Sequence, residues 1–108
     1  MASMTGSSSS DIIAWGRVAS NGTLLAGQGA TAARVGVGRY QITYDNAQAT
    51  ANCAILLTNQ RSPGRDSYEI YFFNDTVNGF FVEINEGDNG TSANTLRDNE
   101  FSFMVLCQ

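Results

Sequence analysis

The sequence predicts an all-β fold, a single antiparallel β-sandwich or jelly-roll-like domain of seven or eight strands. After residue 10, no stretch repeats its apolar residues at the spacing of an amphipathic helix. Short apolar runs instead alternate with clusters of Gly, Asn, Ser and Thr, as in all-β domains. The 108 residues, 43% hydrophobic and 15% charged, suffice for one hydrophobic core and are too few for two.

The domain is predicted to span residues 11–108, preceded by a Ser-rich arm or expression leader at residues 1–10. That first segment, MASMTGSSSS, has no periodic apolar pattern, and it lacks the basic and apolar regions of a secretory signal. It resembles a phage-capsid-derived epitope leader. A native flexible arm, or a replacement for a removed signal peptide, remains an alternative.

Four strands are predicted in the first half of the chain. Ile12–Ala19 ends at Asn21-Gly22, a strong hairpin signal because both residue types tolerate positive φ. Thr23–Ala26 follows, and then a loose Gly-Gln-Gly segment precedes a short strand at Ala32–Val37. Arg39–Tyr44 shows the clearest alternation of the chain. We expect Trp15, Tyr40 and Ile42 to be core residues.

Four further strands are predicted in the second half, and two of them form a hairpin. Asn52–Thr58 is apolar on both faces, which predicts a central strand covered on both sides. Ser67–Phe73 and Phe80–Asn85 are joined by a turn at Asn74–Gly79, and Phe101–Cys107 closes the chain. The polar connections are residues 45–51, 61–66, which carry the only proline, and 86–99.

The two cysteines, Cys53 and Cys107, lie near the start of one predicted strand and at the end of another. The favoured interpretation is a structural disulfide, which would contribute roughly 4 kcal/mol and indicate an oxidising compartment or an extracellular particle. The alternative is a pair of buried free thiols. Two cysteines without histidine cannot complete a zinc site within one chain.

Charge and composition exclude several classes of function. The six basic residues are all Arg, and the net charge of -4 argues against a nucleic-acid partner. The absence of His excludes a Ser-His-Asp triad and imidazole metal sites. No apolar run approaches the length of a membrane span. We therefore predict no cofactor, no catalytic residue, no metal site and no membrane span.

The acidic residues Glu83, Glu86 and Asp88 are the strongest candidates for catalysis, as a carboxylate pair in a glycosidase. A solvated acidic edge is the preferred interpretation. The run at residues 86–90 lacks the ligand spacing of a calcium loop. Asn21, Asn74 and Asn89 each begin an N-x-T triplet, but these residue types are common in turns.

A pattern of motifs covers about Ala14 to Cys107. Its parts are WGRV at residues 15–18, NGTL at 21–24, GVGRYQI at 36–42, Cys53, and FSFMVLC at 101–107. This pattern resembles small secreted bacterial proteins, notably actinobacterial ones, and is similar to repeats in phage tail-fibre and virion-surface domains. The resemblance implies a β-sandwich and no established catalytic residues.

Both faces of the C-terminal strands carry large apolar residues. If Phe72, Phe80 and Phe103 face the core, alternation directs the neighbouring side chains outward into one area. These interface candidates are Tyr71, Phe73, Phe81 and Met104. A small monomer rarely exposes such a patch, so we expect a homo-oligomer, a trimer by analogy with virion-surface modules, or contact with neighbouring structural subunits.

The favoured function is a non-enzymatic structural or binding module that assembles on a virion surface, in a tail fibre or in an extracellular structure. The alternative is a secreted carbohydrate-binding module, with a glycan as partner and Trp15, Tyr68 and Tyr71 as stacking rings. The third hypothesis is a small secreted hydrolase that uses Glu83 with Glu86 or Asp88.

Overall fold

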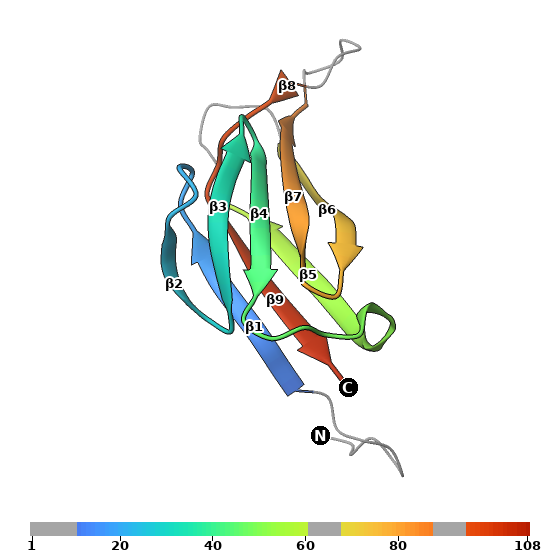
Figure 1. The fold of residues 1–108 in the computed structure, drawn as a ribbon. Coiled ribbons are helices and arrows are strands. Elements are labelled where there is room, and N and C mark those ends of the chain that lie inside the picture. Colours follow the sequence, from blue (N-terminus) through green and yellow to red (C-terminus); the bar gives the residue numbers. More distant parts are fainter. Residues whose placement is uncertain (1–10, 61–67, 88–94) are drawn as a thin grey trace, which may run out of the picture.

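The computed structural model describes residues 11–60, 68–87 and 95–108, and within them the protein is a β-sandwich, as predicted (Figure 1). The predicted arm at residues 1–10 and the Pro63 loop lie outside the described residues. The elements are β1 (Asp11–Val18), β2 (Leu24–Gln28), β3 (Ala30–Gly36), β4 (Arg39–Tyr44), η1 (Thr50–Asn52), β5 (Cys53–Asn59), β6 (Tyr68–Thr76), β7 (Gly79–Glu86), β8 (Thr95–Leu96) and β9 (Phe101–Cys107).

Two antiparallel sheets form the two layers. Sheet A has the strand order β2-β1-β9-β5, and sheet B has the order β3-β4-β7-β6, with the short β8 paired to β7. Figure 1 shows β3 and β4 crossing in front of β1 and β9. The first and last strands are neighbours, with Trp15 opposite Met104 in the β1–β9 ladder.

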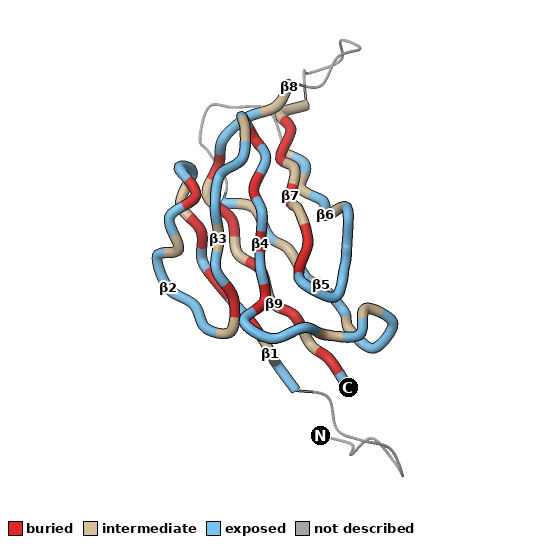
Figure 2. The backbone as a smooth tube through the Cα atoms, in the orientation of Figure 1, coloured by how far each residue is buried: buried red, intermediate tan, exposed pale blue. Residues whose placement is uncertain are grey.

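The core lies between the sheets and is built from alternate residues of each strand. In Figure 2, buried positions alternate with exposed ones along β4 and with intermediate ones along β9, and β7 combines buried and intermediate positions. The rings of Tyr40 and Phe101 lie 5.0 Å apart, and those of Phe80 and Phe103 meet edge-on at 6.0 Å. The alternation predicted for Tyr40 and Ile42 is therefore confirmed, since both are buried.

The predicted hairpin after β1 is confirmed. The Gly22 N–H donates to the Ala19 carbonyl at 2.8 Å, and the Ala19 N–H donates to the Thr23 carbonyl at 2.8 Å. Gly22 has φ of +91°, and a Cβ there would lie 2.4 Å from the Arg34 nitrogen. Both the backbone conformation and the close approach of β3 therefore require glycine.

Some predicted connections are strand in the structure. The segment after Ala26 continues β2 to Gln28, and β3 begins at Ala30, so the only break is Gly29, with φ of +83°. β6 extends to Thr76, which shortens the predicted turn after Phe73. Irregular pairing between Phe73 and Thr76 accommodates this extension.

The prediction that residues 52–58 form a central, doubly covered strand is wrong. β5 is the edge strand of sheet A, with β9 as its sheet neighbour. Ile55 and Leu57 pack against the core, whereas Leu56 points outward and is 48% exposed. The apolar residues of its second face therefore lie on the surface instead of under a further layer.

The prediction that Trp15 is a core anchor is also wrong, because its side chain is 42% exposed. Ala14 and Val18 take the inward positions of β1. Between them, Gly16 leaves room for the Phe103 ring, since a Cβ there would lie 2.5 Å from Phe103 Cε1. The irregular pairing between Ile12 and Ala14 determines which residues of β1 point toward the core, and it directs Trp15 to the outer face.

A buried tyrosine ties the two sheets together at one end. The Tyr40 hydroxyl donates to the Ser20 carbonyl at 2.7 Å and accepts from the Asn99 N–H at 3.2 Å. Asp98 lies beside it and accepts from Arg34 Nε at 3.0 Å and from the Gly38 N–H at 2.8 Å. Burial, the main cause, raises the pKa of Tyr40 to about 12.

Candidate functional site

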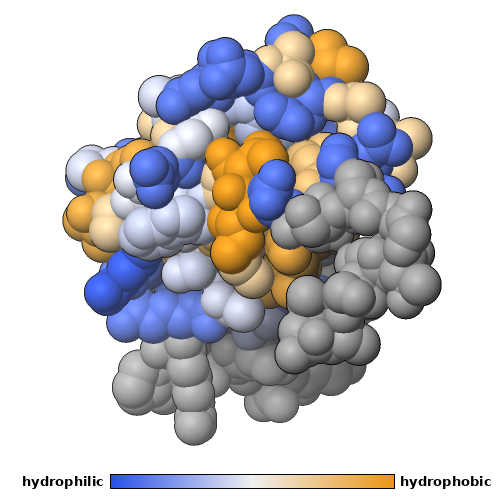
Figure 3. Space-filling view, turned by 90° about the horizontal axis from the view of Figure 1, so that it is seen from below, coloured by the Kyte–Doolittle hydropathy of each residue, from blue (hydrophilic) through white to orange (hydrophobic). Residues whose placement is uncertain are grey.

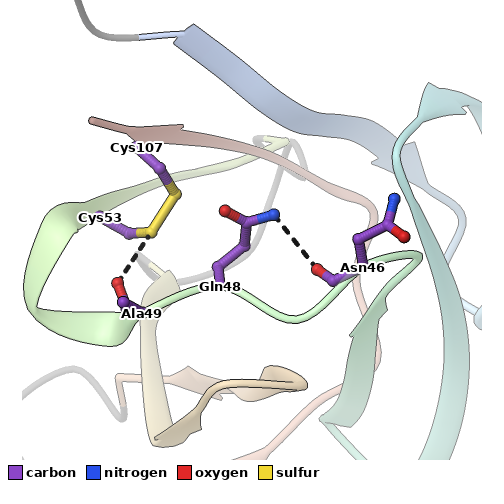
Figure 4. The surroundings of a disulfide bond; sticks show 5 residues. All are labelled: Asn46, Gln48, Ala49, Cys53 and Cys107. Carbon is purple, nitrogen blue, oxygen red and sulfur yellow. Dashed lines mark hydrogen bonds between the residues drawn. A yellow bond between two sulfur atoms is a disulfide. The ribbon is translucent and has the colours of Figure 1, made fainter. Parts of the chain in front are cut away.

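The disulfide between Cys53 and Cys107 is present, as predicted (Figure 4). The two residues are direct partners in the β5–β9 ladder, and the Gln108 N–H donates to the Asn52 carbonyl at 3.0 Å just beyond them. The Ala49 carbonyl oxygen lies 3.4 Å from Cys53 Sγ. A disulfide sulfur has no hydrogen to donate, so this is a packing contact. The bond fastens the edge strand to the last strand.

The outer face of sheet A, called face A below, is an apolar surface across three strands. Its first row is Ile12, Leu106 and Ala54, and its second row is Trp15, Met104 and Leu56. Ile12, Trp15 and Leu56 are each about half exposed, at 56%, 42% and 48%. Figure 3 views the end of the molecule where β1 begins and β9 ends, and hydrophobic residues occupy the middle of that view.

A polar row forms one border of face A. Arg17, Ser102 and Thr58 are cross-strand partners in the third row. The Arg17 guanidinium forms an ion pair with Glu100. The charge of Arg17 is therefore compensated. Among the described residues, the first two rows of face A contain no ionisable side chain.

The outer face of sheet B, called face B, combines aromatic rings with a hydrogen-bonded polar cluster. Arg39, Glu83 and Tyr71 lie side by side on β4, β7 and β6. Arg39 Nε donates to Glu83 Oε1 at 2.9 Å, and the Tyr71 hydroxyl donates to Glu83 Oε2. Asn85 Nδ2 donates to the Tyr71 hydroxyl at 2.8 Å. These hydrogen bonds connect the four side chains of the cluster.

These bonds shift the pKa values of both titratable partners. The hydrogen bond from Tyr71 is the main cause that lowers the pKa of Glu83, and the Arg39 guanidinium lowers it further. The same bond raises the pKa of Tyr71. At neutral pH, Glu83 is therefore an ionised acceptor and Tyr71 a protonated donor.

The next row of face B is aromatic and leads to a hollow. Gln41, Phe81 and Phe73 are neighbours across three strands, and the two phenylalanine rings stack at 5.4 Å. Beyond them lies a hollow of about 510 Å³, a size found among ligand pockets. Gln41, Thr43, Asn74, Asp75, Asn78 and Phe81 contribute to its lining.

The predicted interface candidates do not lie in one area. Tyr71, Phe73 and Phe81 are on face B, whereas Met104 is on face A. The reason is that β7 and β9 belong to different sheets, so their outward side chains point in opposite directions. The outward direction expected for each of the four side chains agrees with the alternation along its strand.

The predicted stacking rings are separated as well. Tyr71 is 44% exposed on face B, and Trp15 lies on face A. Tyr68 is half-buried and packs against the core. The three rings therefore cannot contact one ligand together, and Tyr71 is the only one of them on face B.

The carboxylate pair Glu83 and Glu86, proposed for hydrolysis, does not share a cleft. Glu83 and Glu86 are three positions apart on β7, which places them on opposite sides of sheet B. Arg97 Nε donates to Glu86 Oε1 at 2.7 Å. Asp88, Asn89 and most of the 86–90 run lie outside the described residues. Among residues that are described, no cluster of His, Cys, Asp or Glu could hold a metal ion.

Sequence reasoning named Glu83 and Met104 as candidates but missed their neighbours. These are Arg39, Gln41 and Asn85 on face B, and Ile12, Ala54, Leu56 and Leu106 on face A. Arg39 and Gln41 alternate with the buried Tyr40 and Ile42, and this alternation was the available signal for them. Asn85, although buried, joins the cluster through the β6–β7 register, which the sequence does not reveal. Leu56 was assigned to the core.

In the described ranges, no helix is long and apolar enough to cross a membrane. Comparison of the chain with protein-family models, with curated proteins and with solved structures finds no match.

Proposed function

We propose that this protein is a non-enzymatic structural module that assembles through face A, with a second copy of the chain as its partner. The observation that carries the proposal is the pair of contiguous apolar rows centred on Trp15, Met104 and Leu56. A surface of this kind on a small domain marks an interaction site. A virion surface, a tail fibre or an extracellular structure is the proposed setting, and the disulfide supports an oxidising environment.

The shape of face A supports a second copy as its occupant. Two sheets stack well when both present interdigitating apolar side chains about 10 Å apart, as in the sandwich itself. A two-fold axis through Met104 would place Trp15 and Leu56 of one copy against the same apolar rows of the other. The rows carry no ionisable side chain among the described residues, so the contact would bury no unpaired charge.

The size of face A indicates a weak association. Four strands about 4.8 Å apart, taken at the seven-residue length of β9, cover at most roughly 19 by 24 Å, or about 450 Å² on each copy. The total of about 900 Å² is below that of most stable complexes. We therefore expect assembly at high local concentration, as on a particle or fibre.

Sedimentation of the Leu56→Asp variant tests the proposal. A carboxylate in the middle of face A would be buried without a partner in the complex, so we expect the variant to remain monomeric where the wild type associates. Val35→Asp is the matched control, because Val35 is 51% exposed on β3 of sheet B and should leave association unchanged. Equal association of Leu56→Asp and wild type would refute the role of face A.

The same experiment gives the number of copies. Two-fold stacking of face A predicts a dimer. The trimer expected by analogy requires each copy to contact two neighbours, so a trimeric mass would indicate that a second surface also takes part.

A further inference from the structure

We propose that face B binds a neutral oligosaccharide, with Tyr71 and the Phe73–Phe81 pair as apolar platforms and Arg39, Glu83 and Gln41 as hydrogen-bonding groups. This site lies on the sheet opposite to face A and is independent of assembly.

The Tyr71 ring is exposed to a ligand, and its orientation is fixed by hydrogen bonds. It is 44% exposed, and its hydroxyl is fixed by donation to Glu83 and by acceptance from Asn85 at 2.8 Å. Asn85 is only 5% exposed, which anchors this arrangement in the protein. Binding to a ring that is already held in place costs little conformational entropy. Sugars present apolar C–H faces that suit such a ring.

The polar groups beside the ring match the hydroxyls of a sugar. Arg39 is half exposed and supplies N–H donors, the Glu83 carboxylate supplies acceptors, and Gln41 supplies both. The charges of Arg39 and Glu83 compensate each other across 2.9 Å. Glu69 adds a carboxylate beside Tyr71 and Asp75 adds another in the hollow, so the site has no net positive charge with which to attract a polyanion. This favours a neutral ligand over a sulfated one.

The length of the site indicates an oligosaccharide. From Glu83 to Gly79 the strand covers about 14 Å, calculated from four residues at about 3.4 Å each. This distance joins the Tyr71 row, the Phe73–Phe81 row and the hollow lined by Asn74, Asp75 and Asn78. An extended peptide would be expected to pair with a sheet edge, whereas this site is a sheet face lined by side chains.

The test begins with the oxidised full chain on an array of neutral and sulfated glycans. The proposal predicts binding to at least one neutral oligosaccharide and none that is specific to the sulfated set. The neutral oligosaccharide that binds is then titrated by calorimetry. The proposal is overturned if no neutral glycan binds, or if only sulfated glycans bind.

Variants assign the binding to face B. Tyr71→Ala removes the exposed platform and is expected to weaken binding at least tenfold. Tyr71→Phe keeps the ring and should lose less. Leu25→Ala removes an exposed apolar side chain from β2 of sheet A, outside both proposed sites, and should stay within twofold of the wild type. Thermal melts confirm that each variant is folded. If Tyr71→Ala binds like the wild type, face B is not the site.

Discussion

Removing the Cys53–Cys107 disulfide is expected to lower the free energy of unfolding by about 4 kcal/mol, because the bond closes a loop between residues 54 positions apart and restricts the unfolded chain. This loss is a large part of the 5–15 kcal/mol typical of a small domain. It should also loosen the β5 edge first, because its sheet neighbour is β9.

Urea unfolding of the oxidised and the reduced wild-type chain measures this effect. The reduced chain keeps both side chains, so the comparison excludes the packing lost on substituting Cys107, which is buried. A Cys53→Ala/Cys107→Ala variant provides a second measurement. A difference below about 1 kcal/mol between the oxidised and reduced chains would contradict the account.

Tyr40→Phe is the second substitution with a large expected effect, a loss of about 2 kcal/mol. The phenylalanine ring would fill the same space between the sheets, but the hydrogen bonds of the hydroxyl to the Asn99 N–H and the Ser20 carbonyl would be lost. Each such hydrogen bond contributes about 1 kcal/mol to stability.

Tyr44→Phe is the matched control for this prediction. Tyr44 is also buried, and burial also raises its pKa to about 12. Its ring packs at a tilt against Phe80, and its hydroxyl has no hydrogen bond to the described residues. We expect the free energy of unfolding to change by less than about 0.5 kcal/mol. Equal losses for the two variants, measured by urea unfolding, would show that the Tyr40 hydroxyl bonds do not stabilise the fold.

The local features of the fold could be predicted from the sequence. The alternation around Tyr40 and Ile42 gave the correct inward face of β4, and Asn21-Gly22 gave the correct hairpin. The positions of Cys53 near the start of one predicted strand and Cys107 at the end of another favoured a disulfide over free thiols, and the bond is present. Each of these features depends on residues close in sequence or on a pair of rare residues.

The arrangement of strands into sheets could not be predicted in the same way. An alternating pattern shows that a strand has two faces, but not which neighbour it pairs with or what covers it. Residues 52–58 therefore suggested a central strand, although β5 is an edge. For the same reason, the sequence analysis expected Phe81 and Met104 in one area. No local feature of the sequence shows that β7 and β9 belong to different sheets.

The candidate surfaces depend on this long-range register. Face A brings together Trp15, Leu56 and Met104 from three strands, and the cluster on face B joins Arg39, Tyr71 and Glu83. Individual members could be identified as outward-facing from alternation. Their grouping required the pairing of strands far apart in the chain.

The fluorescence of Trp15 tests self-association through face A most directly. It is the only tryptophan of the chain and lies in the central row of that face. As the protein concentration rises from micromolar to millimolar, we predict a shift of the emission to shorter wavelength and weaker quenching by acrylamide, because the indole ring leaves water. Emission and quenching that stay constant over this range would contradict self-association through face A.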